Sequence, residues 1–281
     1  MTERDEALAA LRMRFDASYS ALWQSMLSEL ADGTDDRLWL TAAASYLFRT
    51  TGVRWAVDPV FRHPAVIDAI NAGRGRALER LSFALYTHEH NDHVHLPTIQ
   101  AMAGLPMKWV VPHFMRDKIA AAGVSADRLV HVRAGERVEI DGVTIRAFDG
   151  RHYDAGTRTG VESLWYAVEA GGRRVFLPGD VRDYDLSRMP AVGKVDNMCA
   201  HVWLGRKNAL NSCPEPFLTQ FAAFIAHVAP SRVFLAHLYE LRRNPNDMWT
   251  RAHGEMVAKA LAAAAPAIRV VMPDVGRGEE L

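Results

Sequence analysis

The feature that most constrains this chain is a cluster of three histidines and one aspartate within the six residues His88-Glu89-His90-Asn91-Asp92-His93. The cluster follows the apolar run LSFALYT at 81–87, which is too short for a typical helix and therefore predicts a buried strand. Imidazole nitrogens suit zinc and other first-row divalent metals, and a carboxylate offsets part of the metal charge. Solvated loop histidines or a helix cap are the structural alternative, but a cap needs only one such side chain. The cluster predicts a metal site at a strand end.

The spacing within the cluster favours two metal ions over one. Alternate side chains of an extended segment share a side, so His88 and His90 can reach the same ion. A turn after Asn91 then lets Asp92 and His93 address a second ion.

Short β runs alternate with helical patterns along the rest of the chain. The runs at 38–48 and 53–57 predict two strands, the second ended by Asp58-Pro59 because proline cannot donate to a strand ladder. Asp141-Gly142 and Gly171-Gly172 are turn signals that predict two hairpins. Two β-rich halves accompanied by helices predict an α/β fold in which two sheets pack face to face with helices outside.

The N-terminal segment predicts a long helix that ends at Asp32-Gly33. Apolar residues at spacings of three and four draw one stripe along it: Leu8, Leu11, Phe15, Tyr19, Leu22, Met26 and Leu30. The stripe either covers the core or contacts a second subunit, which makes this helix the candidate surface for a homo-oligomer. We expect a helical appendage at 1–33 and one domain at 34–281.

Composition narrows the partners and the compartment. Lys plus Arg and Asp plus Glu number 33 each, so no global basic field favours nucleic acid or an anionic membrane. The two cysteines form no metal or disulfide pattern, which fits a reducing cytoplasm. The first residues lack the apolar stretch of a signal peptide, and no run of about 18 apolar residues predicts a membrane span.

The cluster and three later residues resemble the metallo-β-lactamase superfamily, whose signature is His-x-His-x-Asp-His followed by isolated His, Asp and His ligands at strand ends. His152 in AFDGRHYD, Asp180 in VFLPGD and His237 in VFLAH match these positions in order. Asp58 in AVDP matches the early aspartate that sits behind a ligand histidine; a plain turn residue is the alternative. Within the superfamily, the chain most resembles the branch of sugar-phosphate lactonases and phospholipase-D-type phosphodiesterases.

This resemblance implies a four-layer αββα sandwich and a metal-dependent hydrolase with two divalent ions, zinc in first place and manganese or iron as alternatives. The implied ligands are His88, His90, Asp92, His93, His152, Asp180 and His237. Asp180 would bridge the ions, which would hold a hydroxide between them as the nucleophile. Asp92 and Asp180 are therefore candidate catalytic residues, together with His201, which would donate a proton or stabilise an oxyanion, unless it is a core histidine.

The substrate is expected to be a small ester, lactone or phosphodiester, and an anionic one. In the resembling fold the segment AHVWLGRKN enters the metal cleft, which adds Trp203 to the candidate pocket residues. Cations that follow ligand-bearing strand ends could bind a phosphate or solvate the rim: Arg182, Arg206, Lys207, Arg242 and Arg243.

Two other functions share this metal motif. A nucleic-acid-processing nuclease usually needs an added basic surface, which the balanced charge does not provide. A di-iron redox protein is the other, but the resembling redox branch has Glu where this chain has His90, and no flavin domain accompanies the fold. We therefore expect a small-molecule hydrolase.

Overall fold

The computed structural model describes residues 3–240 and 243–281, which cluster into two compact units. The first unit comprises the chain as far as Arg133, together with Ile140–Gly142 and Asp274–Leu281. The second comprises Ala134–Glu139 and Val143–Pro273. Within the described residues, no helix has the length and apolar character that a membrane crossing requires.

The first unit is built on a mixed seven-stranded sheet with the order β14-β1-β2-β3-β4-β5-β6. The strands are β1 (Arg37–Ala42), β2 (Ser45–Thr50), β3 (Val53–Val57), β4 (Leu81–Leu85), β5 (Lys108–Pro112), β6 (Leu129–Val132) and β14 (Gly278–Glu280). Strands β3 to β6 run parallel, whereas β14, β1, β2 and β3 pair antiparallel. The parallel strands bring the residues after β3 and β4 to the same sheet edge.

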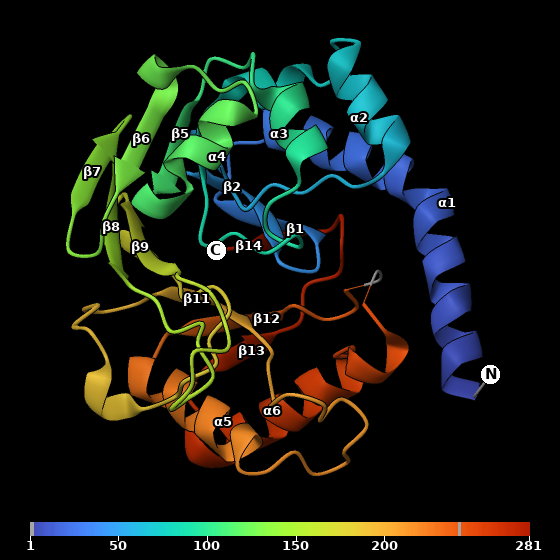
Figure 1. Ribbon diagram of the computed structural model, residues 1–281, viewed down its shortest axis with the longest axis vertical. Coiled ribbons are helices and arrows are strands. Elements are labelled where there is room, and N and C mark those ends of the chain that lie inside the picture. Colours follow the sequence, from blue (N-terminus) through green and yellow to red (C-terminus); the bar gives the residue numbers. More distant parts are fainter. Residues whose placement is uncertain (1–2, 241–242) are drawn as a thin grey trace. The chain divides into compact units, whose positions relative to one another are not determined.

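Helices cover one face of this sheet (Figure 1), and side chains on both of its faces are buried. They are α1 (Glu3–Asp32), α2 (Pro64–Asn71), α3 (Leu96–Met102) and α4 (Arg116–Ala121), with short 3-10 turns η1 (Arg76–Arg80), η2 (His113–Met115) and η3 (Ala126–Arg128). Leu47, Ala56 and Trp109 belong to the helix-covered core. On the opposite face, Phe48 stacks on Trp55 with ring centroids 4.0 Å apart.

The C-terminal half of α1 packs into the core of the first unit. Tyr19, Trp23, Met26, Leu27 and Leu30 are buried there, so the apolar face shifts slightly from the predicted stripe, in which Leu22 is only half-buried. Guanidinium groups also donate to the open carbonyls of the last helical turn: Arg49 to Leu30, Arg54 to Leu30 and Ala31, and Arg80 to Ala31. The separate appendage at 1–33 and its role in a homo-oligomer stay predictions.

The second unit is built on another mixed seven-stranded sheet, in the order β13-β12-β11-β10-β9-β8-β7. Its strands are β7 (Arg137–Ile140), β8 (Val143–Asp149), β9 (Leu164–Ala170), β10 (Arg173–Leu177), β11 (Asn197–His201), β12 (Arg232–Ala236) and β13 (Arg269–Val271). Strands β10 to β13 run parallel, so the loops after them leave from one edge. Helices α5 (Phe217–Val228) and α6 (Arg251–Ala264) pack against each other in this unit, which also holds 3-10 turns η4 (Leu186–Arg188) and η5 (Pro245–Asp247) (Figure 1).

The structure confirms the two predicted hairpin turns, whereas one strand prediction was wrong. Asp141-Gly142 and Gly171-Gly172 all have positive φ, as tight hairpin turns require, and they connect β7 to β8 and β9 to β10. The run at 38–48, predicted as one strand, is instead the hairpin of β1 and β2, with Ala43 and Ala44 in its turn. Two small alanines carry no turn signature, so the sequence pattern did not reveal this break.

Candidate metal centre

In the first unit, the candidate ligands lie on the loop that follows β4. The parallel pairing of β3 and β4 places Asp58, the residue after β3, beside this loop. The Asp58 N–H donates to the Leu85 carbonyl at 2.8 Å, which continues the strand pairing by one residue. Asp58 has a φ of 42°, so the backbone turns sharply away from the sheet while the carboxylate stays at its edge.

The Asp58 carboxylate anchors His93. Its Oδ2 lies 2.7 Å from His93 Nδ1, and both side chains are fully buried. The carboxylate also accepts from the Thr87 N–H at 2.8 Å and from the Thr87 hydroxyl at 2.6 Å. A carboxylate can only accept, so Nδ1 is the donor of this contact, and a neutral His93 ring would then have its lone pair on Nε2. The sequence placed Asp58 behind a ligand histidine without saying which one; the structure pairs it with His93.

His88, His90 and Asp92 complete the group on this loop. His88 is fully buried, and its ring centroid lies 4.9 Å from that of His90 and 4.0 Å from that of His93. The Asp92 carboxylate lies within 4.8 Å of the His93 ring nitrogen that could bind the same ion. The His93 N–H donates to the His90 carbonyl at 2.9 Å, which forms the turn expected after Asn91.

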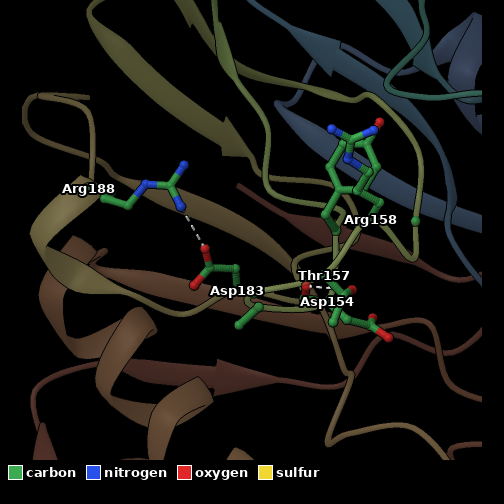
Figure 2. A pocket seen from close by; sticks show the side chains of 9 residues that line it. Asp154, Thr157, Arg158, Asp183 and Arg188 are labelled. Atoms are coloured by element: carbon green, nitrogen blue, oxygen red, sulfur yellow. Dashed lines mark hydrogen bonds and ion pairs between the residues drawn. The ribbon is translucent and has the colours of Figure 1, made fainter.

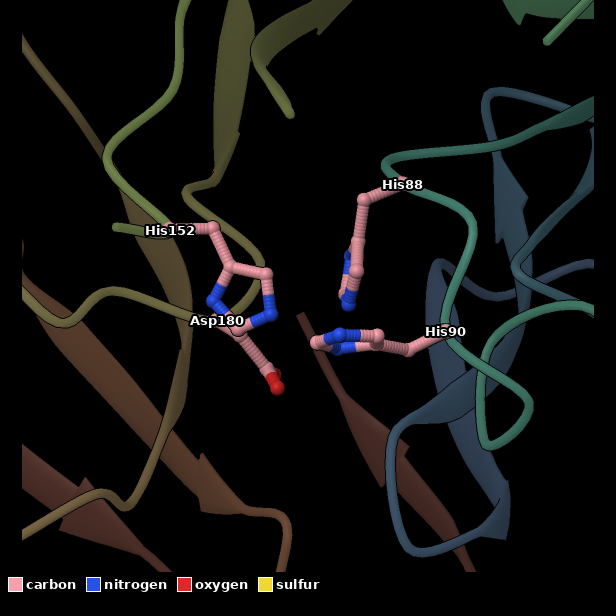
Figure 3. Close-up of side chains that lie close together, drawn as sticks. All are labelled: His88, His90, His152 and Asp180. Carbon is pink, nitrogen blue, oxygen red and sulfur yellow. The ribbon is translucent and has the colours of Figure 1, made fainter. Parts of the chain in front are cut away.

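In the second unit, four candidate residues lie at strand ends. His152 and Asp180 lie in the loops after β8 and β10, His201 ends β11, and His237 directly follows β12. All four are buried. Figure 3 shows His152 and Asp180 on these two loops, and His88 and His90 on the loop after β4. The ligand atoms of His152 and Asp180 lie within 4.8 Å of each other, as do those of Asp180 and His237.

Asp180 contacts two histidines of its own unit. Its Oδ1 lies 2.7 Å from His201 Nδ1, and its Oδ2 lies 3.9 Å from His237 Nε2. His237 Nδ1 faces the Val202 carbonyl oxygen at 3.4 Å, so Nε2 is the nitrogen turned toward the carboxylate. The His201 and His237 rings are stacked with centroids 5.6 Å apart. His201 is thus a direct partner of Asp180.

Two of the predicted cations share one carboxylate. Arg206 donates from Nε and Nη2 to Asp154 Oδ2 at 3.0 and 2.8 Å, and Arg182 Nη1 lies 3.5 Å from Asp154 Oδ1. The Arg182 guanidinium also lies over the Trp203 ring, 5.9 Å from its centroid. Burial lowers the pKa of Arg182, and the charges of Asp180 and Asp154 oppose this shift. Asp154 therefore ties the loop after β8 to those after β10 and β11.

Two further predicted cations, Lys207 and Arg243, also belong to the second unit. Lys207 is exposed and has a φ of 63°. Arg243 Nε lies 3.8 Å from Glu240 Oε2. Arg242 lies outside the described residues. Contact with a substrate stays a prediction for all of them.

Two residues escaped sequence reasoning. Thr87 bonds Asp58, and its hydroxyl also lies 3.0 Å from His88 Nδ1. Asp154 forms ion pairs with Arg182 and Arg206, and Arg206 lies 52 positions away in the chain. Each stands within two residues of a candidate ligand, which is the only sequence signal that marks either.

The fold and these strand-end residues define a protein of the metallo-β-lactamase type. The chain belongs to the metallo-β-lactamase superfamily, because the family described as "Beta-lactamase superfamily domain" matches residues 54–238. The family match confirms the predicted resemblance to this superfamily. Most members of the superfamily are metal-dependent hydrolases. The predicted fold class is confirmed as well, since two mixed sheets flanked by helices are the architecture of the α/β sandwich of this superfamily.

Individual relatives are distant. The uncharacterized protein Rv0906 of Mycobacterium tuberculosis is 24% identical over 107 residues, which cover 37% of this chain and 29% of that protein. Igni18, a metallo hydrolase from the archaeon Ignicoccus hospitalis, has a TM-score of 0.64 at 15% identity and covers 88% of this chain and 99% of its own. CmlA, a diiron β-hydroxylase from Streptomyces venezuelae, has a TM-score of 0.61 at 14% identity, and the match covers 89% of this chain and 55% of the CmlA chain. At these identities, Igni18 and CmlA are similar to this chain in fold alone.

Proposed function

We propose that this protein is a binuclear metal-dependent hydrolase that cleaves a small ester, lactone or phosphodiester. The observation that carries the proposal is the orientation of two candidate ligands, one in each unit. Asp58 and the Val202 carbonyl face Nδ1 of His93 and His237, so each imidazole presents Nε2 for a metal. Histidines held from behind by an oxygen acceptor are typical of metal sites, where the acceptor fixes the tautomer and raises ligand basicity.

The candidate ligands form two sets with one member in common. From the order of the superfamily signature we infer that His88, His90, His152 and Asp180 bind one ion, and that Asp92, His93, Asp180 and His237 bind the other. The donor set fits a divalent metal, because each set combines imidazole nitrogens with a carboxylate that compensates charge. Asp180 belongs to both sets, which is what a bridging ligand requires. Zinc suits these donors best, and manganese and iron are the alternatives.

The bound ions would activate a water and polarise the oxygen of the scissile group. Asp180 would be the ligand common to both ions, and His201 holds Asp180 by the 2.7 Å contact to its Oδ1. His201 Nε2, the ring nitrogen away from this contact, is the atom that would donate a proton to a leaving group or stabilise an oxyanion. Asp58 and Thr87 keep the His93 ring in place.

We expect the substrate to be small and anionic. The charges of the chain balance at 33 against 33, which argues against a nucleic-acid polymer as partner. Local cations are nevertheless present in the second unit, where Arg182 and Arg206 lie on the loops after β10 and β11. The relation to the sugar-phosphate lactonase and phospholipase-D-type branch stays a prediction.

The test combines elemental analysis of freshly purified protein with a panel of chromogenic phosphodiesters, lactones and esters. We expect about two equivalents of metal per chain and turnover of at least one substrate class. Removal of the metal with a chelator should abolish turnover, and re-addition of zinc should restore it. Turnover that survives complete metal removal would refute the proposal, and iron with oxygen-dependent chemistry in place of hydrolysis would favour the di-iron alternative.

A further inference from the structure

A short hairpin begins directly after His152, in the loop between β8 and β9. The Asp154 N–H donates to the Thr159 carbonyl at 2.9 Å, and an isolated antiparallel bridge closes the base of the hairpin. Gly160 has a φ of 146°, and a Cβ at this position would lie 2.0 Å from the carbonyl oxygen of His152. Residues 153–160 are therefore held tightly against the backbone of a candidate metal ligand.

This hairpin forms one wall of a hollow with a volume of about 640 Å³. The segment after Asp180 forms another part of the wall. The polar lining residues are Tyr153, Asp154, Thr157, Arg158, Asp183 and Arg188 (Figure 2). The volume falls within the range of about 300–1,000 Å³ that is usual for small-molecule sites.

Among the described residues, most charged side chains that line the hollow have a partner of opposite charge. Arg188 Nη1 lies 3.0 Å from Asp183 Oδ2, and Asp154 forms ion pairs with Arg182 and Arg206. Arg158 is exposed and makes no hydrogen bond or ion pair with any residue of the described ranges 3–240 and 243–281. Figure 2 shows the Arg158 and Arg188 side chains on opposite sides of the hollow.

We propose that this hollow is the subsite that binds an oxyanion, a carboxylate or a phosphate, at the end of the substrate remote from the scissile bond, with Arg158 as the binding residue. The proposal rests on the hydrolytic function proposed above. A guanidinium presents a fixed fork that matches two oxygens of either group. Asp154 is a positioning residue, because it holds Arg182 and Arg206 in place and joins the hairpin to the loops after β10 and β11.

The assignment differs from the expectation based on sequence. Arg182 and Arg206 follow ligand-bearing strands, but their guanidinium groups are already engaged by Asp154. A substrate anion would have to compete with that carboxylate for them. Among the described residues Arg158 has no such competitor, so an anion would have to displace only water from its guanidinium.

The first experiment compares two p-nitrophenyl esters that differ only at the far end. One is the monoester of glutaric acid, and the other is its neutral glutaramide analogue; a third ester carries a phosphate in place of the carboxylate. We expect Arg158→Ala to lower the preference for the charged esters, measured as the ratio of kcat/KM values, about 10- to 150-fold. Arg158→Lys should retain part of the preference. Arg137→Ala, at an exposed arginine of β7 outside the hollow, should retain all of it.

The second experiment measures the binding of inorganic phosphate and of glutarate to the purified protein by isothermal titration calorimetry. Arg158→Ala should weaken one or both by a factor similar to the kinetic one, and Arg137→Ala should weaken neither. Unchanged anion preference and unchanged binding in Arg158→Ala would overturn the subsite while leaving the hydrolytic function intact. If no variant cleaves any ester, the proposed function fails for esters, and the calorimetric comparison alone decides the subsite.

Discussion

The contact between Asp58 and His93 predicts that a change at Asp58 lowers the affinity for metal. The perturbation is Asp58→Asn, which removes the negative charge and keeps the shape of the side chain. Asn tolerates the left-handed backbone that Asp58 adopts at a φ of 42°, so the change adds no backbone strain. The amide oxygen can still accept from the Thr87 N–H, as Oδ1 does at 2.8 Å.

The expected loss follows from what His93 requires. Its Nδ1 lies 2.7 Å from the carboxylate in a fully buried environment, and an amide is a weaker acceptor that supports the ligand tautomer less firmly. Loss of such an acceptor behind a metal ligand typically costs about 10- to 100-fold in metal affinity. This corresponds to about 1.4–2.8 kcal/mol of binding free energy.

The assay is competition for zinc between the protein and a chromogenic chelator, with Asp149→Asn as the matched control. Asp149 ends β8 and is exposed, so its replacement should leave the zinc affinity unchanged. Circular dichroism and thermal melting of the metal-free proteins report whether Asp58→Asn still folds. A folded Asp58→Asn variant that binds both zinc equivalents with the affinity of the unmodified protein would refute the reasoning.

Asp180, Gly160 and the two cysteines offer further tests of the structure. Asp180→Ala should abolish hydrolysis of the true substrate while circular dichroism stays native, because Asp180 lies in the loop after β10 and not in a strand or helix. Near-normal turnover would contradict the two-metal site. Gly160→Ala should lower the thermal midpoint more than Gly156→Ala, since both have positive φ but only the former would clash with a backbone carbonyl, and the strain is of the order of 1–3 kcal/mol. A thiol reagent should modify the exposed Cys213 in the native protein and spare Cys199, because burial raises the pKa of the Cys199 thiol. Equal rates of modification at both cysteines would show that strand β11, which contains Cys199, is not protected from solvent.

Local patterns predicted those parts of the fold that depend on neighbouring residues. The turns at Asp141-Gly142 and Gly171-Gly172 need positive φ at adjacent positions, which their residue types supply. The run at 81–87 becomes β4, with its last two residues outside the strand. The missed hairpin between β1 and β2 shows the limit, because alanine is compatible with strand, helix and turn alike.

The sequence by itself determined which chemistry is available: a dense histidine cluster, single ligands at later strand ends and a balanced overall charge. It could not determine which side chains would neutralise one another, because hydrogen bonds and ion pairs depend on distances between residues far apart in the chain. Asp58 and His93 are 35 positions apart, and Asp154 and Arg206 are 52 apart. Only the tertiary structure therefore decided that Asp154 engages Arg182 and Arg206 and that Arg158 remains available, since pairing in space follows from the path of the folded backbone.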